Sequence, residues 1–147
     1  MAPGTVVGVN DTRFDTKIAV AVRDDLQPWQ RLNVTAFLVS GIAAAHPELV
    51  GQPYADADAN GYLPLLGQPV VVLEADAATL RAARGRAVGR GLDTALFTAE
   101  MFSTGHDGAN RAAVAAVAAD DLDVVGLAVH GPRNPVDKVL KGARAHP

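Results

Sequence analysis

Two apolar segments near opposite ends of the chain constrain its fold more than any other feature. Residues 17–26 read KIAVAVRDDL, and residues 124–142 read VVGLAVHGPRNPVDKVLKG. Each begins with a nearly continuous apolar run, which predicts a strand buried on both faces of a sheet. We expect the two strands to lie side by side at the centre of one sheet, with their ends in one small region.

The sequence between these segments predicts alternating helices and strands. Pro28 suits the first position of a helix over 28–45, which His46-Pro47 would end. That helix is apolar on two sides, so we expect it to be buried. Further strands are expected at 70–74 and 94–98, and further helices at 76–90 and 111–118. Within the second segment, we expect the strand at 122–130 and a last helix at 134–143. Asn60-Gly61, flanked by Tyr54 and Tyr62, predicts a hairpin with a type I′ turn.

Four strands alternating with helices predict an α/β fold with helices on both faces of the sheet. We expect a flexible arm over 1–16 and a single domain over 17–147, with the hairpin at 54–65 as an addition. Ligands of such sheets bind beyond the carboxyl ends of the strands. Those ends are expected at 23–25, after Glu74, after Thr98 and at 130–133.

Composition narrows the classes of function. The 147 residues are 49% hydrophobic and 20% charged, as in globular proteins, and include no cysteine. Disulfides, thiolate metal sites and cysteine nucleophiles are therefore excluded, and a cytoplasmic location is expected. The net charge of −3 argues against sequence-independent nucleic-acid binding. No apolar run approaches the roughly 20 residues of a membrane helix, so no membrane partner is expected.

The strand segments, together with VVVLEADAATLRAARGRAVGRGLDTALF at 70–97, resemble the archaeal and eukaryotic type of peptidyl-tRNA hydrolase over residues 17–143. The whole chain is similar to the bacterial domain-of-unknown-function family numbered two thousand, through RDDLQPWQRLNVTAF, EMFSTGHDGANR and GLAVHGPR. The resemblance implies a four-stranded mixed sheet with helices on both faces, a three-layer sandwich. The expected assembly is a homodimer.

The resemblance does not extend to the catalytic residues of the hydrolase. That enzyme begins its first helix with a Gly-Lys stretch followed by Gln, whereas residues 29–33 read WQRLN and contain no lysine. Its acidic loop reads Asp-Ala-Gly-x-Thr-Gln, whereas residues 107–112 read DGANRA and keep only the Asp. The resemblance therefore implies a scaffold more than an activity.

The segment 105–111, GHDGANR, is the strongest functional candidate. His106 or Asp107 would act as a general base near neutral pH. Asn110 would orient a substrate, and Arg111 would hold negative charge. The structural alternative is a loop whose Asp caps the following helix.

A second candidate group lies around the start of the first helix. Asp24 and Asp25 would bind a cation or position a water, or would simply complement the positive helix N-terminus. Gln30 and Asn33 would line a pocket with Trp29 as a wall, or would bond the acidic turn. The candidate set is thus His106 and Asp107 as catalytic residues, with Asp24, Asp25, Trp29, Gln30, Asn33, Asn110 and Arg111 for substrate binding.

Three functional hypotheses follow. The first is a pocket for a small polar or anionic ligand between residues 24–33 and 106–111, hydrolase-like if the protein is an enzyme. The second is peptidyl-tRNA hydrolase activity, with tRNA as the partner. The third is a non-catalytic binding or assembly domain. The four histidines are isolated in the sequence and match no zinc motif, so neither a metal site nor a cofactor is expected.

Overall fold

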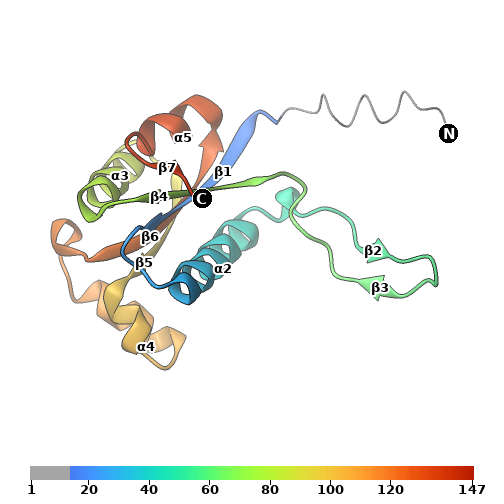
Figure 1. Cartoon of the computed structure of the whole chain (residues 1–147), viewed down its shortest axis with the longest axis horizontal. Helices are drawn as coiled ribbons and strands as arrows, with labels where there is room; N and C mark the ends of the chain where they lie inside the picture. Colours follow the sequence, from blue (N-terminus) through green and yellow to red (C-terminus); the bar gives the residue numbers. More distant parts are fainter. Residues whose placement is uncertain (1–13) are drawn as a thin grey trace.

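Five strands form the main sheet of the protein, in the order β5-β6-β1-β4-β7 (Figure 1). The structure is a computed structural model that describes residues 14–147. The strands of the sheet are β1 (Thr16–Arg23), β4 (Val70–Ala75), β5 (Asp93–Thr98), β6 (Val124–Pro132) and β7 (Arg144–Ala145). The helices are α2 (Pro28–Ala45), α3 (Ala77–Gly89), α4 (Asp107–Ala115) and α5 (Arg133–Val139). Short 3₁₀ turns lie at η1 (Pro47–Leu49), η2 (Ala99–Ser103) and η3 (Ala119–Asp121).

The predicted adjacency of the two apolar strands is confirmed. β1 pairs with β6 in antiparallel fashion, with Val20 opposite Ala128. β1 pairs with β4 in parallel, and β5 and β7 add to the two edges in antiparallel fashion, so the sheet is mixed as expected. The expected four strands are corrected to five because Arg144–Ala145 pairs with β4. A strand of two residues is too short to produce a recognisable alternation pattern.

The expectation that the strand ends share one region is wrong for β6. Thr16, at the start of β1, lies opposite Pro132, at the end of β6. The carboxyl end of β6 therefore lies beside the start of β1, at the opposite end of the strands from Arg23. The carboxyl ends of β1, β4 and β5 do lie at the same end of the sheet, since β5 and β1 both run antiparallel to β6.

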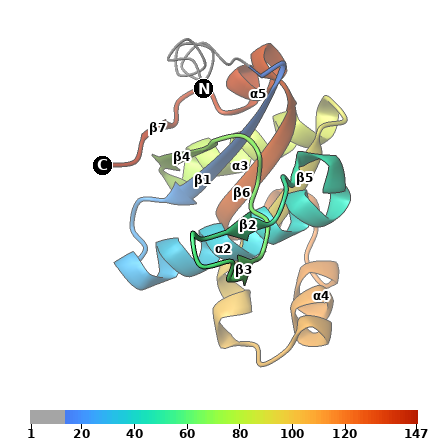
Figure 2. The same ribbon diagram turned by 90° about the vertical axis from the view of Figure 1, so that its right-hand side faces the viewer.

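Helices cover both faces of the sheet, which confirms the predicted layers (Figure 2). On one face, buried residues of α3 and α5, among them Leu80, Ala83 and Val136, pack against Ala19 and Ala21 of β1. On the other face, Val34, Leu38 and Ile42 of α2 pack against Ile18, Val20 and Val22 of β1. Alternate residues of β1 thus point into two separate cores, which is why its sequence is apolar throughout.

The bounds predicted for α2 are confirmed, but its burial on two sides is not. Only the stripe Val34, Leu38 and Ile42 is buried. Leu32 on the other apolar stripe is 74% exposed, and Ala36 is also exposed. Helical periodicity identifies an apolar stripe but does not show whether a partner covers it.

The predicted hairpin is present as β2 (Tyr54–Ala55) and β3 (Gly61–Tyr62), with Tyr54 opposite Tyr62. It extends away from the sheet as an arm (Figure 1). The predicted type I′ turn is wrong: Ala59 has the positive φ of 67°, and Gly61 belongs to β3. The carboxylate of Asp56 instead accepts hydrogen bonds from the backbone N–H groups of Asp58 and Asn60, and so sets the loop.

The bounds of two helices differ from their predictions. α4 spans Asp107–Ala115 rather than 111–118, and α5 spans Arg133–Val139 rather than 134–143. Residues 1–13 of the predicted N-terminal arm lie outside the described residues, and Thr16 already belongs to β1. Within residues 14–147, none of the helices combines the length and the apolarity that crossing a bilayer requires.

Candidate functional site

A groove of about 530 Å³ lies between α2, β5 and the segment that leads from η2 into α4. Its wall is aromatic: Trp29 packs edge-on against Phe102 at 6.1 Å between ring centroids, and Phe102 contacts Phe97 at 5.1 Å. Phe37 meets Phe97 at 5.9 Å. Trp29 and Phe37 remain 60% and 55% exposed, so a ligand in the groove would contact both rings.

Polar side chains gather at the α4 end of this groove. The Asn110 amide oxygen accepts a hydrogen bond from the Thr104 hydroxyl. His106 is the N-cap of α4, and its Nδ1 accepts the backbone N–H of Ala109 at 3.1 Å. Asp107 forms an ion pair with Arg111 one turn along the helix. The start of α4 thus presents the imidazole of His106 and the amide of Asn110, and the helix fixes the backbone positions of both residues.

The structure brings part of the predicted site together. Trp29, Asn33, His106, Asp107 and Asn110 all line the groove. Their role in binding stays a prediction, but α2 and α4 do place their side chains around one cavity.

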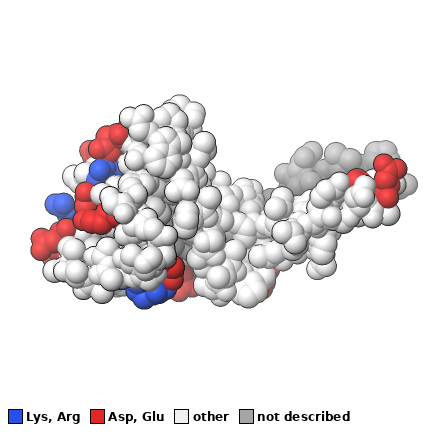
Figure 3. Space-filling view, turned by 90° about the horizontal axis from the view of Figure 1, so that it is seen from below, with Lys and Arg blue, Asp and Glu red and all other residues white. Residues whose placement is uncertain are grey.

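Figure 3 shows the underside of the molecule, where charged side chains gather towards the edges and at the end of the arm.

Four other predicted residues lie outside the groove lining. The side-chain oxygen of Gln30 accepts a hydrogen bond from the backbone N–H of Gln27 at 2.9 Å, and so gives this backbone donor at the start of α2 a partner. Asp25 pairs with Arg23 at 2.7 Å, and Asp24 with Arg144 at 3.0 Å. Arg111 pairs with Asp107. Each of these groups therefore has a partner within the protein, but neither aspartate lies in the first turn of α2.

An ion-pair network occupies the edge of the sheet where β1 and β4 end. Glu74, 9% exposed, accepts from Arg31 at 3.2 Å and from Arg144 at 2.9 Å. Arg31 also donates to the carbonyl oxygens of Asp24 and Leu26. Because these donors and acceptors satisfy one another, polar contacts tie this edge together, and Arg31 and His146 also line a cavity of about 540 Å³ beside α2.

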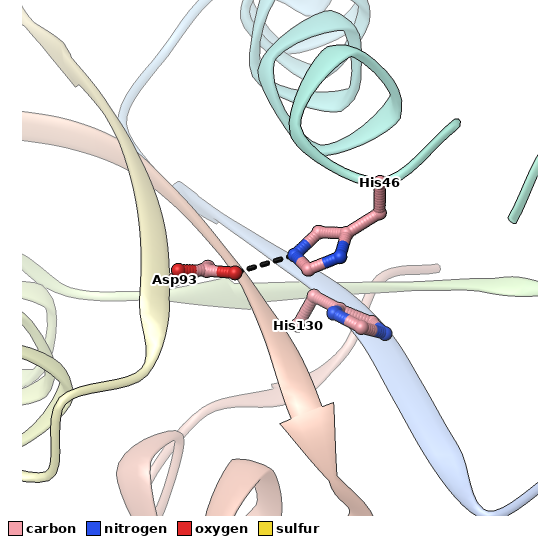
Figure 4. A group of neighbouring side chains, drawn as sticks. All are labelled: His46, Asp93 and His130. Carbon is pink, nitrogen blue, oxygen red and sulfur yellow. Dashed lines mark hydrogen bonds and ion pairs between the residues drawn. The ribbon is translucent and has the colours of Figure 1, made fainter. Parts of the chain in front are cut away.

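A second polar cluster lies at the other end of β5 and joins His46, Asp93 and His130 (Figure 4). Asp93 and His130 are direct cross-strand partners on β5 and β6. His46 is the C-cap of α2, and its ring lies against that of His130 at 4.4 Å between centroids. The Nε2 of His46 contacts the Asp93 carboxylate, and its Nδ1 lies 2.9 Å from Oε1 of Glu48.

The two imidazoles of this cluster have opposite pKa shifts. The hydrogen bond with Glu48, followed by that with Asp93, raises the pKa of His46 above its ordinary value. Burial, followed by the positive charge of His46, lowers the pKa of His130. Relative to free imidazoles, the two carboxylates favour the charged form of His46, and burial favours the neutral form of His130. A neutral imidazole and a carboxylate are groups that bind metal ions or protons.

No sequence pattern predicted this cluster. Its residues lie far apart in the chain, and 47 residues separate His46 from Asp93 alone. Only the antiparallel register of β5 with β6 and the length of α2 bring them together. A register prediction for β5 and β6 would have placed Asp93 opposite His130, but no feature of the sequence specifies that register uniquely.

Comparison with known proteins gives a family model and a similar solved structure. A family model described as "Protein of unknown function (DUF2000)" matches residues 16–147. The solved structure of Atu0240, a protein of unknown function from Agrobacterium tumefaciens str. C58, is similar at 50% sequence identity and a TM-score of 0.90. The similarity covers 92% of this chain and 100% of that chain. No curated protein matches the chain. The protein belongs to the DUF2000 family, whose function is unknown.

Proposed function

We propose that this protein binds a small polar ligand in the groove between α2, β5 and α4. The supporting observation is that one groove combines an aromatic wall, which includes Trp29 and Phe102, with the polar side chains of Asn33, His106 and Asn110. The volume of about 530 Å³ lies within the range typical of small-molecule sites. A flat, partly apolar molecule that carries hydrogen-bonding groups fits this lining.

The charge of the lining favours a polar ligand over an anionic one. Among the described lining residues, Asp107 is the carboxylate and no arginine or lysine is present. The Arg111 guanidinium pairs with Asp107 and lies outside the lining. An anion would have to draw Arg111 away from Asp107, which would leave that carboxylate unpaired beside the ligand.

The geometry favours binding without hydrolysis over a hydrolase-like activity. Nδ1 of His106 accepts the N–H of Ala109, so the neutral ring carries its proton on Nε2. A ring in that tautomer has no free nitrogen to accept a proton from water. Asp107, the other candidate base, is held by Arg111. Peptidyl-tRNA hydrolase activity on a peptidyl-tRNA-hydrolase-like scaffold remains the second hypothesis, supported by the strand and helix segments that resemble that enzyme.

Trp29 is the single tryptophan of the chain, so its fluorescence reports directly on the groove. We expect a member of a panel of nucleosides, amino acids and small carboxylates to change this emission saturably and to raise the melting temperature. Asn33→Ala should weaken binding at least several-fold. Asn134→Ala, an exposed amide on α5, is the matched control and should not.

Two results would count against the proposal. If no member of the panel changes Trp29 emission or the melting temperature, groove binding loses its support. If the purified chain hydrolyses peptidyl-tRNA above the blank rate, and the His106→Ala variant does not, the second hypothesis replaces the first. Peptidyl-tRNA turnover should otherwise remain at the blank rate.

We also propose that the protein is a homodimer located in the cytoplasm. The exposed residues Tyr54, Tyr62, Leu63 and Leu65 of the arm and Leu32 of α2 support self-association, because exposed apolar patches mark interaction surfaces. Light scattering coupled to gel filtration should give twice the mass of 15.2 kDa. Leu63→Asp should shift the equilibrium towards the monomer. Val88→Asp, at an exposed apolar residue of α3, is the control; a wild-type monomer at high concentration would contradict the proposal.

A further inference from the structure

We propose that His46, Asp93 and His130 form a binding site for one divalent transition-metal ion, for which Zn²⁺ is the probe. Each residue offers one donor atom, and these atoms all lie within 4.8 Å of one another. This site is separate from the proposed groove, and neither depends on the other. Figure 4 shows the three side chains converging from α2, β5 and β6.

The donor set selects the class of metal. Two imidazole nitrogens and one carboxylate oxygen suit borderline ions such as Zn²⁺, Co²⁺ and Ni²⁺, whereas Mg²⁺ and Ca²⁺ prefer oxygen alone. Three protein ligands leave one position of a tetrahedral ion for water. Because the Asp93 side chain is 58% exposed, solvent has access to that position.

The distances between the donor atoms require only a small rearrangement of the side chains to hold an ion. Ligand atoms about 2.0–2.2 Å from a tetrahedral zinc ion lie about 3.3 Å from one another. Nε2 of His46 and the Asp93 carboxylate are already in hydrogen-bond contact. They would separate slightly to admit an ion between them. The rings of His46 and His130, at 4.4 Å between centroids, would adjust by side-chain rotation.

The backbone that carries the donors is fixed by the fold. Asp93 and His130 are paired across β5 and β6, which puts their side chains on one face of the sheet as close neighbours. The His46 backbone N–H donates to the carbonyl oxygen of Ile42, whose side chain is 2% exposed in the core. The ligand positions therefore belong to the rigid part of the molecule, as a preorganised metal site needs.

Glu48 supplies the outer contact that metal-binding histidines commonly have. Its Oε1 lies 2.9 Å from Nδ1 of His46, which leaves Nε2 directed at Asp93. A carboxylate that accepts from the distal ring nitrogen orients the ring and strengthens the nitrogen that binds the ion. The Nε2 of His130 is buried without a hydrogen-bond partner among the described residues. A buried polar atom without a partner is costly, so no described contact holds the His130 ring through Nε2.

The test is zinc titration of the full chain, purified without a histidine tag and treated with chelator. Isothermal titration and competition with a chromophoric chelator should give one Zn²⁺ per chain. Co²⁺ should give a visible absorption spectrum with the intensity of a tetrahedral site. His130→Ala and Asp93→Asn should each weaken affinity by at least 100-fold, and Glu48→Gln by about 10- to 100-fold.

The controls use the histidine–aspartate pair at the start of α4. His106→Ala and Asp107→Asn remove the same kinds of side chain from exposed positions outside the cluster, so zinc affinity should not change. Asp93 lies at the exposed start of an edge strand, so Asp93→Asn should keep the wild-type circular dichroism spectrum. The proposal is overturned if the wild type binds Zn²⁺ no more tightly than the His46→Ala/His130→Ala double variant. It is also overturned if folded Asp93→Asn binds as tightly as the wild type.

Discussion

Gly126 of β6 lies directly beneath Val34 of α2, and a Cβ placed on Gly126 would come within 2.4 Å of Val34 Cγ1. The same Cβ would lie 3.0 Å from Leu38 Cδ1. Val34 and Leu38 are two of the three buried residues of α2. The absence of a side chain at Gly126 therefore sets how closely α2 approaches the sheet, and with it the width of the groove.

We expect Gly126→Ala to destabilise the protein by about 1–3 kcal/mol, because the buried Val34 has no room to move. Urea unfolding followed by circular dichroism measures the change. Gly85→Ala is the matched control: a Cβ there meets nothing within 4 Å, and the residue lies inside α3. It should stabilise the protein by about 0.5–1 kcal/mol. A neutral Gly126→Ala would mean that α2 is less closely packed than described.

Phe97 stabilises the groove from below. It is 4% exposed and contacts the rings of Phe37 and Phe102. Phe97→Ala should reduce the free energy of unfolding by about 3–5 kcal/mol, since it leaves a cavity between three elements. Phe97→Leu keeps most of the volume and should cost less than about 1.5 kcal/mol. Equal losses for the two variants in urea unfolding would argue against a packing role.

Arg31 holds the end of β1 to β4 and α2. Its guanidinium donates to Glu74 and to the carbonyl oxygens of Asp24 and Leu26. Arg31→Met should destabilise the protein by about 1–3 kcal/mol because these acceptors lose a donor. Arg31→Lys should not restore stability, since one ammonium group cannot replace the planar fork.

Arg111→Met is the control for Arg31 in the same unfolding experiment. The Arg111–Asp107 pair is 72% and 81% exposed at its two side chains. Solvent screens such a pair, so its removal should change stability by less than about 0.5 kcal/mol. A loss for Arg31→Met that is no larger than this would show that the Glu74 network contributes little.

The hairpin arm should respond to acid through Asp56. Hydrogen bonds from Tyr62 first, and then from Asn60, lower the pKa of Asp56 from 3.8 to about 2. Because the folded pKa lies below the unfolded one, the carboxylate stabilises the hairpin above pH 3.8, and this contribution is lost as the pH falls through about 2. NMR titration of the Asp56 carboxyl carbon measures the midpoint directly.

Tyr62→Phe removes the largest cause of this shift and should raise the pKa of Asp56 towards its ordinary value. Tyr54→Phe changes the residue opposite Tyr62 but removes no described hydrogen bond to Asp56. Its titration should match the wild type. A midpoint near 3.8 in the wild-type protein would mean that the Asp56 loop is not formed in solution.

Local sequence determined the elements that carry strong, short-range signals. The apolar runs of β1 and β6 predicted two central strands because a strand covered on both faces cannot expose polar groups on either. Pro28 and His46-Pro47 fixed both ends of α2, since proline restricts helix position through its own ring geometry. Asp76 opens the helix predicted over 76–90, and as the N-cap of α3 it accepts the N–H of Thr79 at 2.8 Å.

The sequence of residues 105–111, GHDGANR, did not predict the residue at which α4 begins. The segment allows a helix from Asp107 or from Arg111, and the structure selects the first, with His106 rather than an aspartate as the cap. That choice turns Asn110 towards Thr104 and the groove. The sequence identified the polar residues of this rim, whereas the helix start decided which of them face the cavity.

Tertiary structure alone decided which distant residues meet. The direction of β6 could not be read from its composition, because parallel and antiparallel central strands are equally apolar. Because β6 runs antiparallel to β1 and β5, His130 lies far from Arg23, opposite Asp93 and against the ring of His46. Local patterns thus determined where the strands and helices form, whereas strand direction and register, which depend on the whole packed sheet, created the histidine cluster.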